Sequence, residues 1–216
     1  MRISKLLFVI IVLFFGAYSE ICADELNIEQ PVKKTVGDTC SYRTVDGWTG
    51  IEENQFTWKF VGISEKGYEV SELLVKTGKV SVVMMTLDFN IKEIVGGTKY
   101  EINSGYYSFP LFTGKSWKTK TGFIGRSLHG TFLIVGEVVG EESVTVPAGT
   151  FSTMKIEVKS YADVMLEESR REWTEIRTVW YIPKLGCFAK RTLDIMGGNG
   201  RIFRKVSTEL QGYTVN

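Results

Sequence analysis

The chain contains 216 residues, of which 44% are apolar, 12% aromatic and 24% charged. This composition excludes a disordered chain, and 22 glycines with only four prolines and no Gly-X-Y period exclude a collagen-like one. The 26 basic and 25 acidic residues give a net charge of +1, which excludes the electrostatic footprint of a nucleic-acid-binding protein or a polybasic membrane-surface segment.

The amino-terminal segment has the pattern of an export signal. Two cations in residues 1–5 precede an apolar run over residues 6–18, which is shorter than the roughly 20 residues of a membrane-spanning helix. We predict a signal peptide over residues 1–23, cleaved between Ala23 and Asp24. An uncleaved anchor and lipidation at Cys22 are the weaker alternatives, because Ile21 is large for the position before a lipidated cysteine.

Cleavage would change the totals. It removes two basic and one acidic residue, which leaves 24 of each and a formally neutral chain. It also removes Cys22, so that Cys40 and Cys187 remain. No later apolar run reaches transmembrane length, and we expect a soluble, exported protein in an oxidising periplasmic or extracellular compartment.

The rest of the chain alternates with period two, which predicts strands. The pattern is clearest at residues 154–159, where apolar and charged side chains alternate. Charged side chains of this kind, Glu157 and Glu175 included, are interpreted as the solvated face of a sheet. The expected strands cover residues 40–43, 57–63, 68–75, 79–89, 99–102, 131–139, 142–146, 154–159, 175–182, 186–193 and 201–210.

Turn signals separate these strands. The clearest is Gly197-Gly198-Asn199-Gly200, which predicts a tight hairpin, and Val139-Gly140 is interpreted as another turn. Residues 165–173 are interpreted as a charged hairpin tip, with a helical turn as the alternative, and residues 104–125 as irregular. The prediction is an all-β fold with little helix, in which about ten strands form a single antiparallel curved sheet that closes into a barrel or half-barrel over one domain, residues 24–216.

Enzyme signatures are weak. His129 is the single histidine, so the sequence holds no histidine-based metal cluster and no H-E-x-x-H motif, and no G-x-S-x-G elbow is present. The segment Thr113–Ser116 imitates the end of a phosphate-binding loop, but Phe109 stands where that loop needs a glycine. Carboxylates such as Asp88, Asp163 and Asp194 are acid–base candidates by residue type alone. We predict no catalytic residue, no metal and no cofactor.

The cysteines leave two interpretations open. Cys40 lies in the first predicted strand and Cys187 in the second-last, and neither has a C-x-x-C partner. Closure of the sheet would make its terminal strands neighbours, so the pair is a candidate disulfide. Two buried free thiols are the alternative.

A group of aromatic residues lies in the turn-rich segment. Because such side chains can cover or line a cavity at a barrel mouth, they are candidate ligand-lining or lid residues, while simple packing over the barrel end is the alternative. The six candidates are Tyr106, Tyr107, Phe109, Phe112, Trp117 and Phe123.

Four motifs occur in order along the chain: GDTCSYR at residues 37–43, PLFTGKSW at 110–117, VPAGTF at 146–151 and WYIPKLG at 180–186. In the last two, Pro147 with Gly149 and Pro183 with Gly186 are expected to form structural turns. Together the motifs resemble a group of uncharacterised bacterial exported proteins, classed as a domain of unknown function, although Cys40 stands where that group has an aromatic residue. More distantly, the chain is similar to curved-sheet carriers of the bacterial envelope that shelter lipid chains.

The export signal, the strand pattern, the weak enzyme signatures and the aromatic segment lead to the hypothesis of a non-enzymatic periplasmic or envelope protein whose concave face binds a lipid or another apolar small molecule. A structural or interaction module with a filled core and an envelope protein as partner is the alternative. A hydrolase that uses carboxylates or Ser/Thr without histidine is the third hypothesis.

Overall fold

A computed structural model describes residues 26–216. The predicted leader, its cleavage site and Cys22 lie outside these residues. Twelve strands and no helix are present in the described part of the chain. The strands are β1 Thr39–Asp46, β2 Glu52–Ser64, β3 Gly67–Leu74, β4 Lys79–Met85, β5 Ile91–Ile94, β6 Lys99–Tyr100, β7 Ser116–Ile124, β8 Leu128–Val146, β9 Gly149–Leu166, β10 Ser169–Ile182, β11 Cys187–Gly197 and β12 Ile202–Thr214.

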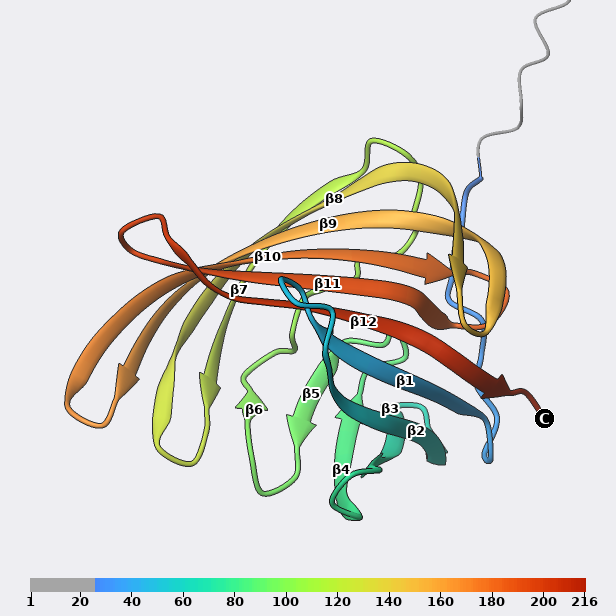
Figure 1. The fold of residues 1–216 in the computed structure, drawn as a ribbon, viewed down its shortest axis with the longest axis horizontal. Coiled ribbons are helices and arrows are strands. Elements are labelled where there is room, and N and C mark those ends of the chain that lie inside the picture. The colour runs from blue at the N-terminus through green and yellow to red at the C-terminus, as the bar shows by residue number, and fades with distance from the viewer. Residues whose placement is uncertain (1–25) are drawn as a thin grey trace, which may run out of the picture.

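Every strand pairs antiparallel with its neighbours in the sequence, and β1 also pairs with β12, so that the sheet closes into a barrel. Figure 1 shows β1 and β12 side by side, and β8 to β12 as long strands that curve around the molecule. The predicted all-β antiparallel barrel is confirmed, with twelve strands in place of about ten. Closure pairs the backbone N–H and C=O groups of edge strands, which would otherwise be free to pair with another chain.

The core lies inside the barrel and follows the period of two. Along β9, Ile156, Val158, Ser160, Ala162 and Val164 are buried, while the residues between them face solvent. Most of the buried side chains form one large apolar cluster. A second, smaller cluster is centred on Phe123, Ala162 and Val164. The apolar interior therefore consists of two separate clusters.

Several turns agree with the sequence. The tight turn after Gly197 joins β11 to β12, and residues 167–168 form the tip between β9 and β10 in place of a helical turn. Pro147 lies in the turn between β8 and β9, where Gly149 has a φ of 131°. Pro183 lies in the turn between β10 and β11, where Gly186 has a φ of 61°.

Other expectations about the strands were wrong. Val139-Gly140 is a bulge within β8, where Gly140 adopts a φ of 148° and the pairing with β9 shifts by one residue. The strand expected over residues 79–89 ends at Met85, because residues 86–90 form a turn. The segment 104–125 contains the regular strand β7, and β5 was not expected at all.

No helix among residues 26–216 is long and apolar enough to cross a membrane.

Candidate functional site

Strand β10 carries charged side chains into the barrel. Its inward positions include Glu175, Arg177, Val179 and Tyr181; Arg177 is 8% exposed and the Glu175 side chain 13%. The expectation that Glu175 lies on the solvated face was therefore wrong. Alternation divides a strand into two faces, and here the buried Val179 and Tyr181 decide which face is inside.

Strand β11 adds a second cation beside the first. Arg191 pairs with Val179, and Leu193 pairs with Arg177, so that the two arginines are diagonal neighbours on the same face of adjacent strands. Diagonal neighbours of this kind have Cα atoms roughly 7–8 Å apart, which two arginine side chains span easily. Two guanidinium groups thus face the same space inside the barrel.

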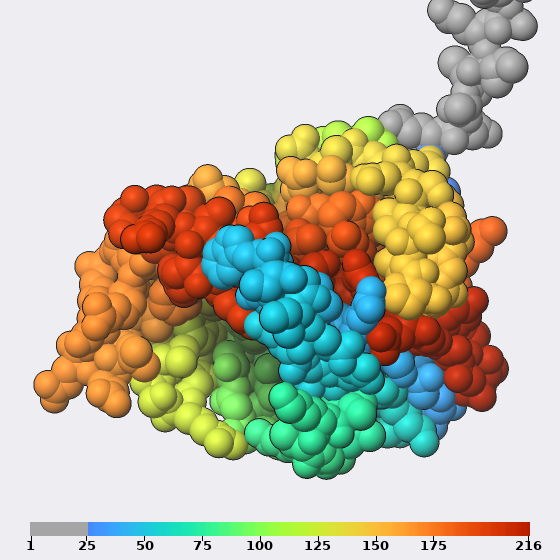
Figure 2. Space-filling model, viewed as in Figure 1, coloured from blue at the N-terminus to red at the C-terminus, as the bar shows by residue number. Residues whose placement is uncertain are grey.

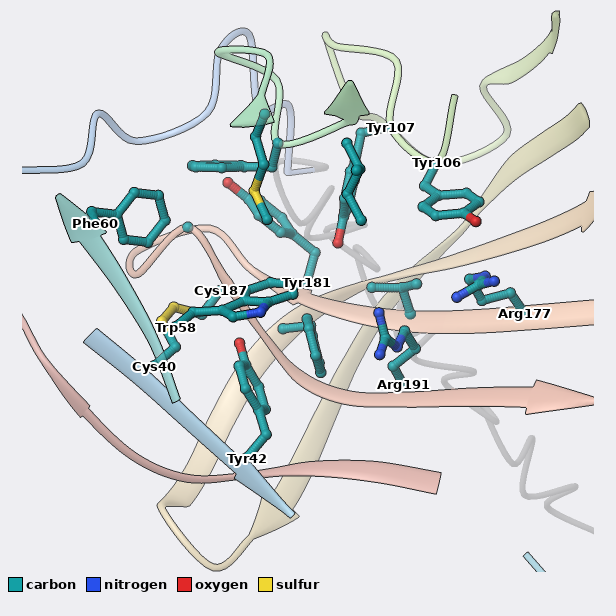
Figure 3. A pocket seen from close by; sticks show the side chains of 16 residues that line it. Cys40, Tyr42, Trp58, Phe60, Tyr106, Tyr107, Arg177, Tyr181, Cys187 and Arg191 are labelled. Atoms are coloured by element: carbon teal, nitrogen blue, oxygen red, sulfur yellow. A yellow bond between two sulfur atoms is a disulfide. The ribbon is translucent and has the colours of Figure 1, made fainter. Parts of the chain in front are cut away.

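That space is a small internal cavity of about 40 Å³. Figure 3 shows Arg177 and Arg191 at one end of it and the disulfide with Trp58 at the other. Because one water molecule needs roughly 10–15 Å³ by this measure, the cavity has room for about three waters or a small polar group. Its walls are mainly aromatic, and none of the 16 residues that line it is acidic.

The aromatic walls are closely packed. The Tyr42 ring stacks on Phe188 with centroids 4.2 Å apart and on Phe56 at 5.1 Å, and the Trp58 ring meets Tyr42 edge-on at 5.7 Å. Offset-stacked and edge-to-face pairs are the favoured aromatic geometries. The side chains at this end of the barrel are therefore closely packed around the small cavity.

The charge of Arg177 is partly balanced. Its Nη2 donates to Glu175 Oε2 at 2.9 Å, while Trp173 Nε1 donates to the other carboxylate oxygen at 3.1 Å. The guanidinium carbon lies 4.3 Å from the centroid of the Tyr106 ring. Burial alone would lower the pKa of Arg177, but Tyr106 and Glu175 outweigh it and raise that pKa. The Nε of Arg177 is buried and has no hydrogen-bond partner among the described residues.

Arg191 has no comparable partner. It forms no ion pair within residues 26–216, and its guanidinium carbon lies 4.9 Å from the centroid of the Phe188 ring. Burial, followed by repulsion from Arg177, lowers its pKa. Tyr107 does not supply a counter-charge, because burial raises the pKa of its hydroxyl to about 12 and keeps it neutral. The cavity therefore carries an excess of positive charge.

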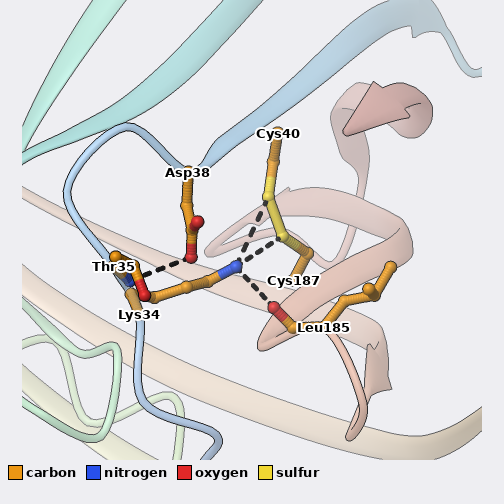
Figure 4. The surroundings of a disulfide bond; sticks show 6 residues. All are labelled: Lys34, Thr35, Asp38, Cys40, Leu185 and Cys187. Atoms are coloured by element: carbon orange, nitrogen blue, oxygen red, sulfur yellow. Dashed lines mark hydrogen bonds between the residues drawn. A yellow bond between two sulfur atoms is a disulfide. The ribbon is translucent and has the colours of Figure 1, made fainter. Parts of the chain in front are cut away.

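At the opposite end of the cavity, Cys40 and Cys187 are joined by a disulfide with Cα atoms 6.8 Å apart. The side chain of Lys34 lies against it (Figure 4), with Nζ 3.4 Å from the sulfur of Cys187 and hydrogen-bonded to the carbonyl oxygen of Leu185. Lys34 is 5% exposed, and its ammonium lies 5.1 Å from the centroid of the Phe60 ring. Burial lowers the pKa of Lys34 to about 8, although nearby Asp38 opposes the shift.

The lowered pKa of Lys34 predicts a stability that rises with pH. The ordinary pKa is 10.5, so between pH 8 and 10.5 the unfolded chain holds a proton that the folded chain has released. At 1.36 kcal/mol for each pKa unit, the free energy of unfolding should increase by about 3 kcal/mol over this range. Urea denaturation at several pH values, compared with Lys34→Met, tests this expectation. An equal slope in the variant would show that Lys34 is not the titrating group.

The six predicted lining residues do not converge on one site. Tyr106 and Tyr107 line the internal cavity. Phe109 packs beside it, with its ring centroid 5.8 Å from that of Tyr181, and Phe112 is 42% exposed. Trp117 and Phe123 lie on β7; Phe123 belongs to the second apolar cluster.

Two side chains of the PLFTGKSW motif hold the loop that precedes β7 in place. The Nζ of Lys115 donates to the carbonyl oxygens of Ser108 and Pro110, the latter at 2.6 Å. Trp117 Nε1 donates to the carbonyl oxygen of Gly105 at 3.0 Å. The indole lies directly over Gly136, where an added Cβ would stand 2.2 Å from its ring atoms. Lys115, the lysine of the segment that imitates a phosphate-binding loop, thus fixes the segment that carries Tyr106 and Tyr107.

An open groove of about 780 Å³ lies at the other end of the barrel, around the tip of the β7–β8 hairpin. Its apolar surface comes from Tyr100, Phe123, Ile124 and Leu128, and the second apolar cluster continues it inward to Phe132. Figure 2 shows the surface hollowed beside this hairpin, which is drawn in yellow-green. The volume lies within the range of roughly 300–1,000 Å³ typical of small-molecule sites.

Two of the three carboxylates that were acid–base candidates form ion pairs, and burial raises the pKa of the third, Asp88, although nearby Lys115 opposes the shift. Asp163 pairs with Arg170 at the β9–β10 tip, and Asp194 pairs with Lys205 between β11 and β12. His129 is an exposed residue of β8 on the rim of the groove. Within residues 26–216, no three His, Cys, Asp or Glu side chains are arranged to hold a metal ion.

Solved structures share this architecture. One is a candidate lipoprotein from Parabacteroides distasonis, with a TM-score of 0.57 and 15% identity over 88% of this chain and 100% of that one. Another is a candidate exported protein with a YmcC-like fold from Bacteroides fragilis, with a TM-score of 0.53 and 14% identity over 86% of this chain and 99% of that one. No family model and no curated protein matches the sequence. At these identities the similarity establishes the fold.

Proposed function

We propose that this chain is a non-enzymatic, exported protein of the bacterial cell envelope that binds a lipid acyl chain in the open groove. The observation that carries the proposal is the groove itself, with its apolar lining of Tyr100, Phe123, Ile124 and Leu128 and its volume of about 780 Å³. The signal-like leader supports export, and so do the descriptions of the two structural neighbours as lipoprotein and exported protein.

The groove suits an acyl chain better than the internal cavity does. The cavity offers about 40 Å³ behind a closely packed aromatic wall, whereas the groove is open and far larger. Each buried methylene contributes about 0.8 kcal/mol, so an apolar groove of this size can hold a chain without specific polar contacts. We therefore place the lipid at the barrel rim and not deep in the concave face.

Ile124→Glu tests this function. Ile124 is 69% exposed and lines the groove, so a carboxylate there should leave the fold intact while opposing an apolar ligand. We expect the affinity for a pyrene-labelled long-chain alcohol to fall at least tenfold. Lipid that co-purifies with the wild-type protein, detected by native mass spectrometry, should also be lost.

Val80→Glu is the matched control. Val80 is a 59% exposed aliphatic residue of β4 that does not line the groove; β5 separates its strand from β6, which carries Tyr100. Val80→Glu should bind the alcohol as the wild type does. Equal binding by Ile124→Glu and the wild type, or no saturable binding by either, would contradict the proposal.

A second function, as an interaction module of the envelope, is favoured by one observation. Leu73 of β3 and Val80 of β4 are direct cross-strand partners on the outer face, and they are 39% and 59% exposed. An exposed apolar pair on neighbouring strands is typical of a contact surface. Crosslinking in the native envelope should then capture a partner with the wild type and with Ile124→Glu but not with Val80→Glu.

A further inference from the structure

The internal cavity carries more positive charge than its surroundings neutralise. Arg177 and Arg191 both face it, and no acidic residue lines it. Glu175, the carboxylate that pairs with Arg177, has both oxygens occupied, one by Arg177 and one by Trp173. Since arginine stays protonated in proteins, at least one guanidinium charge inside the barrel has no counter-ion from the described chain.

An uncompensated charge in a barrel interior is costly. Arg177 is buried and paired with Glu175, whereas Arg191 is half-buried and unpaired. Removing an ion even partly from water without pairing it costs free energy, and perturbed charges of this kind cluster at functional sites. The buried Nε of Arg177, without a hydrogen-bond partner among residues 26–216, adds an unused donor at the same place. Arg177 is itself more than nine-tenths buried, so solvent does not readily satisfy this donor.

The geometry favours one class of anion. A guanidinium presents its donors in a planar fork that matches the two oxygens of a carboxylate. The Tyr106 and Phe188 rings lie against the two guanidinium groups, at 4.3 and 4.9 Å from centroid to guanidinium carbon. Nε of Arg177 is left without a partner among residues 26–216, and Arg191 makes no ion pair there. The volume of about 40 Å³ admits a carboxylate group but no bulky body. Tyr107, neutral and at the wall of the cavity, can add a hydroxyl donor.

We propose that Arg177 and Arg191 form an internal binding site for a carboxylate anion, enclosed by the aromatic residues of the barrel and by the loop that carries Tyr106 and Tyr107. The site is separate from the rim groove and does not depend on the binding of a lipid there. The carboxylate belongs either to a small organic acid or to the head of a longer one whose body displaces the loop.

Acetate and acetamide are the first pair of probes, because they have nearly the same shape and differ in charge. We expect acetate to bind saturably, observed by line broadening of ¹³C-labelled acetate and by an increase in melting temperature. Acetamide, and chloride at the same ionic strength, should have no such effect. Equal effects of acetate and chloride would overturn the site as a carboxylate site.

Three variants connect the binding to the arginines. Arg191→Gln should weaken acetate binding at least tenfold. Glu175→Gln should strengthen it at least threefold, because it removes the carboxylate that competes for Arg177. Arg201→Gln, at an exposed arginine in the turn before β12, is the matched control and should bind as the wild type does.

The outcomes separate clearly. Unchanged binding in Arg191→Gln would overturn the proposal, and so would weaker binding in a folded Glu175→Gln variant. If Arg191→Gln does not fold, Glu175→Gln still tests the site, because its expected effect has the opposite sign. Decanoate and benzoate, measured in Ile124→Glu so that the rim groove does not contribute, then identify the source: tighter binding than acetate indicates a longer acid, and exclusion indicates a small one.

Discussion

Loss of the Cys40–Cys187 disulfide should lower the free energy of unfolding by about 5 kcal/mol. The bond joins residues 147 positions apart, and in the chain-entropy model such a long loop restricts the unfolded chain strongly. A domain has only about 5–15 kcal/mol of stability in total, so this change approaches the whole margin. The double variant Cys40→Ala/Cys187→Ala, measured by urea denaturation, gives the value.

The wild-type protein in excess reductant is the control for packing. Reduction breaks the bond but keeps both sulfur atoms, so agreement between the reduced protein and the double variant assigns the loss to the cross-link. The dependence of unfolding free energy on urea should also steepen without the bond, because the unfolded chain then exposes more surface. An unchanged denaturation midpoint on reduction would contradict the expectation.

Gly67→Ala should cost about 4 kcal/mol, because two penalties coincide at this position. Gly67 begins β3 with a φ of 133°, which side chains rarely adopt. An added Cβ would also stand 1.9 Å from the carbonyl oxygen of Met85, which belongs to the backbone of β4 and cannot rotate away. The melting temperature of the variant should fall accordingly, and the packing of the adjacent, buried Tyr68 should be disturbed.

Two other glycines separate the cost of backbone strain from the cost of the steric clash. Gly78 has a φ of 66° and nothing within 4 Å of an added Cβ, so Gly78→Ala should cost only the backbone strain, about 1 kcal/mol. Gly198 has neither feature, and Gly198→Ala should be close to neutral. A loss in Gly67→Ala no greater than in Gly78→Ala would show that β3 moves away from β4 without difficulty.

The architecture could be predicted from the sequence because the dominant signal, alternation of apolar and charged residues, is strong in the long strands. β9 is the clearest case. Gly140 misled the prediction, because a glycine with positive φ serves equally in a turn and in a bulge, and only the pairing of β8 with β9 distinguishes them. β7 was missed because two of its inward residues are Thr119 and Thr121, which give little apolar contrast.

The candidate site was harder to predict. The arginines appear in the sequence as ordinary charges of alternating strands, and Glu175 was assigned to the wrong face. Glu175, Arg177, Val179 and Tyr181 occupy alternate positions of one strand, so the sequence could have placed all four on one face. The pairing of Arg191 with Val179, however, depends on an irregular register after Trp180. Such a register follows from tertiary packing and cannot be read from one strand alone.

Because β1 pairs with β12, the barrel cannot close until the whole chain has been synthesised. Strand β1 gains one partner early, from β2, but its other partner is the last strand of the chain. Until residues 202–214 are available, one edge of β1 remains unpaired, and the β12 of another copy can pair with it. A carboxy-terminal truncation that removes β12 would therefore expose the edges of β1 and β11, and truncated copies should associate through these edges.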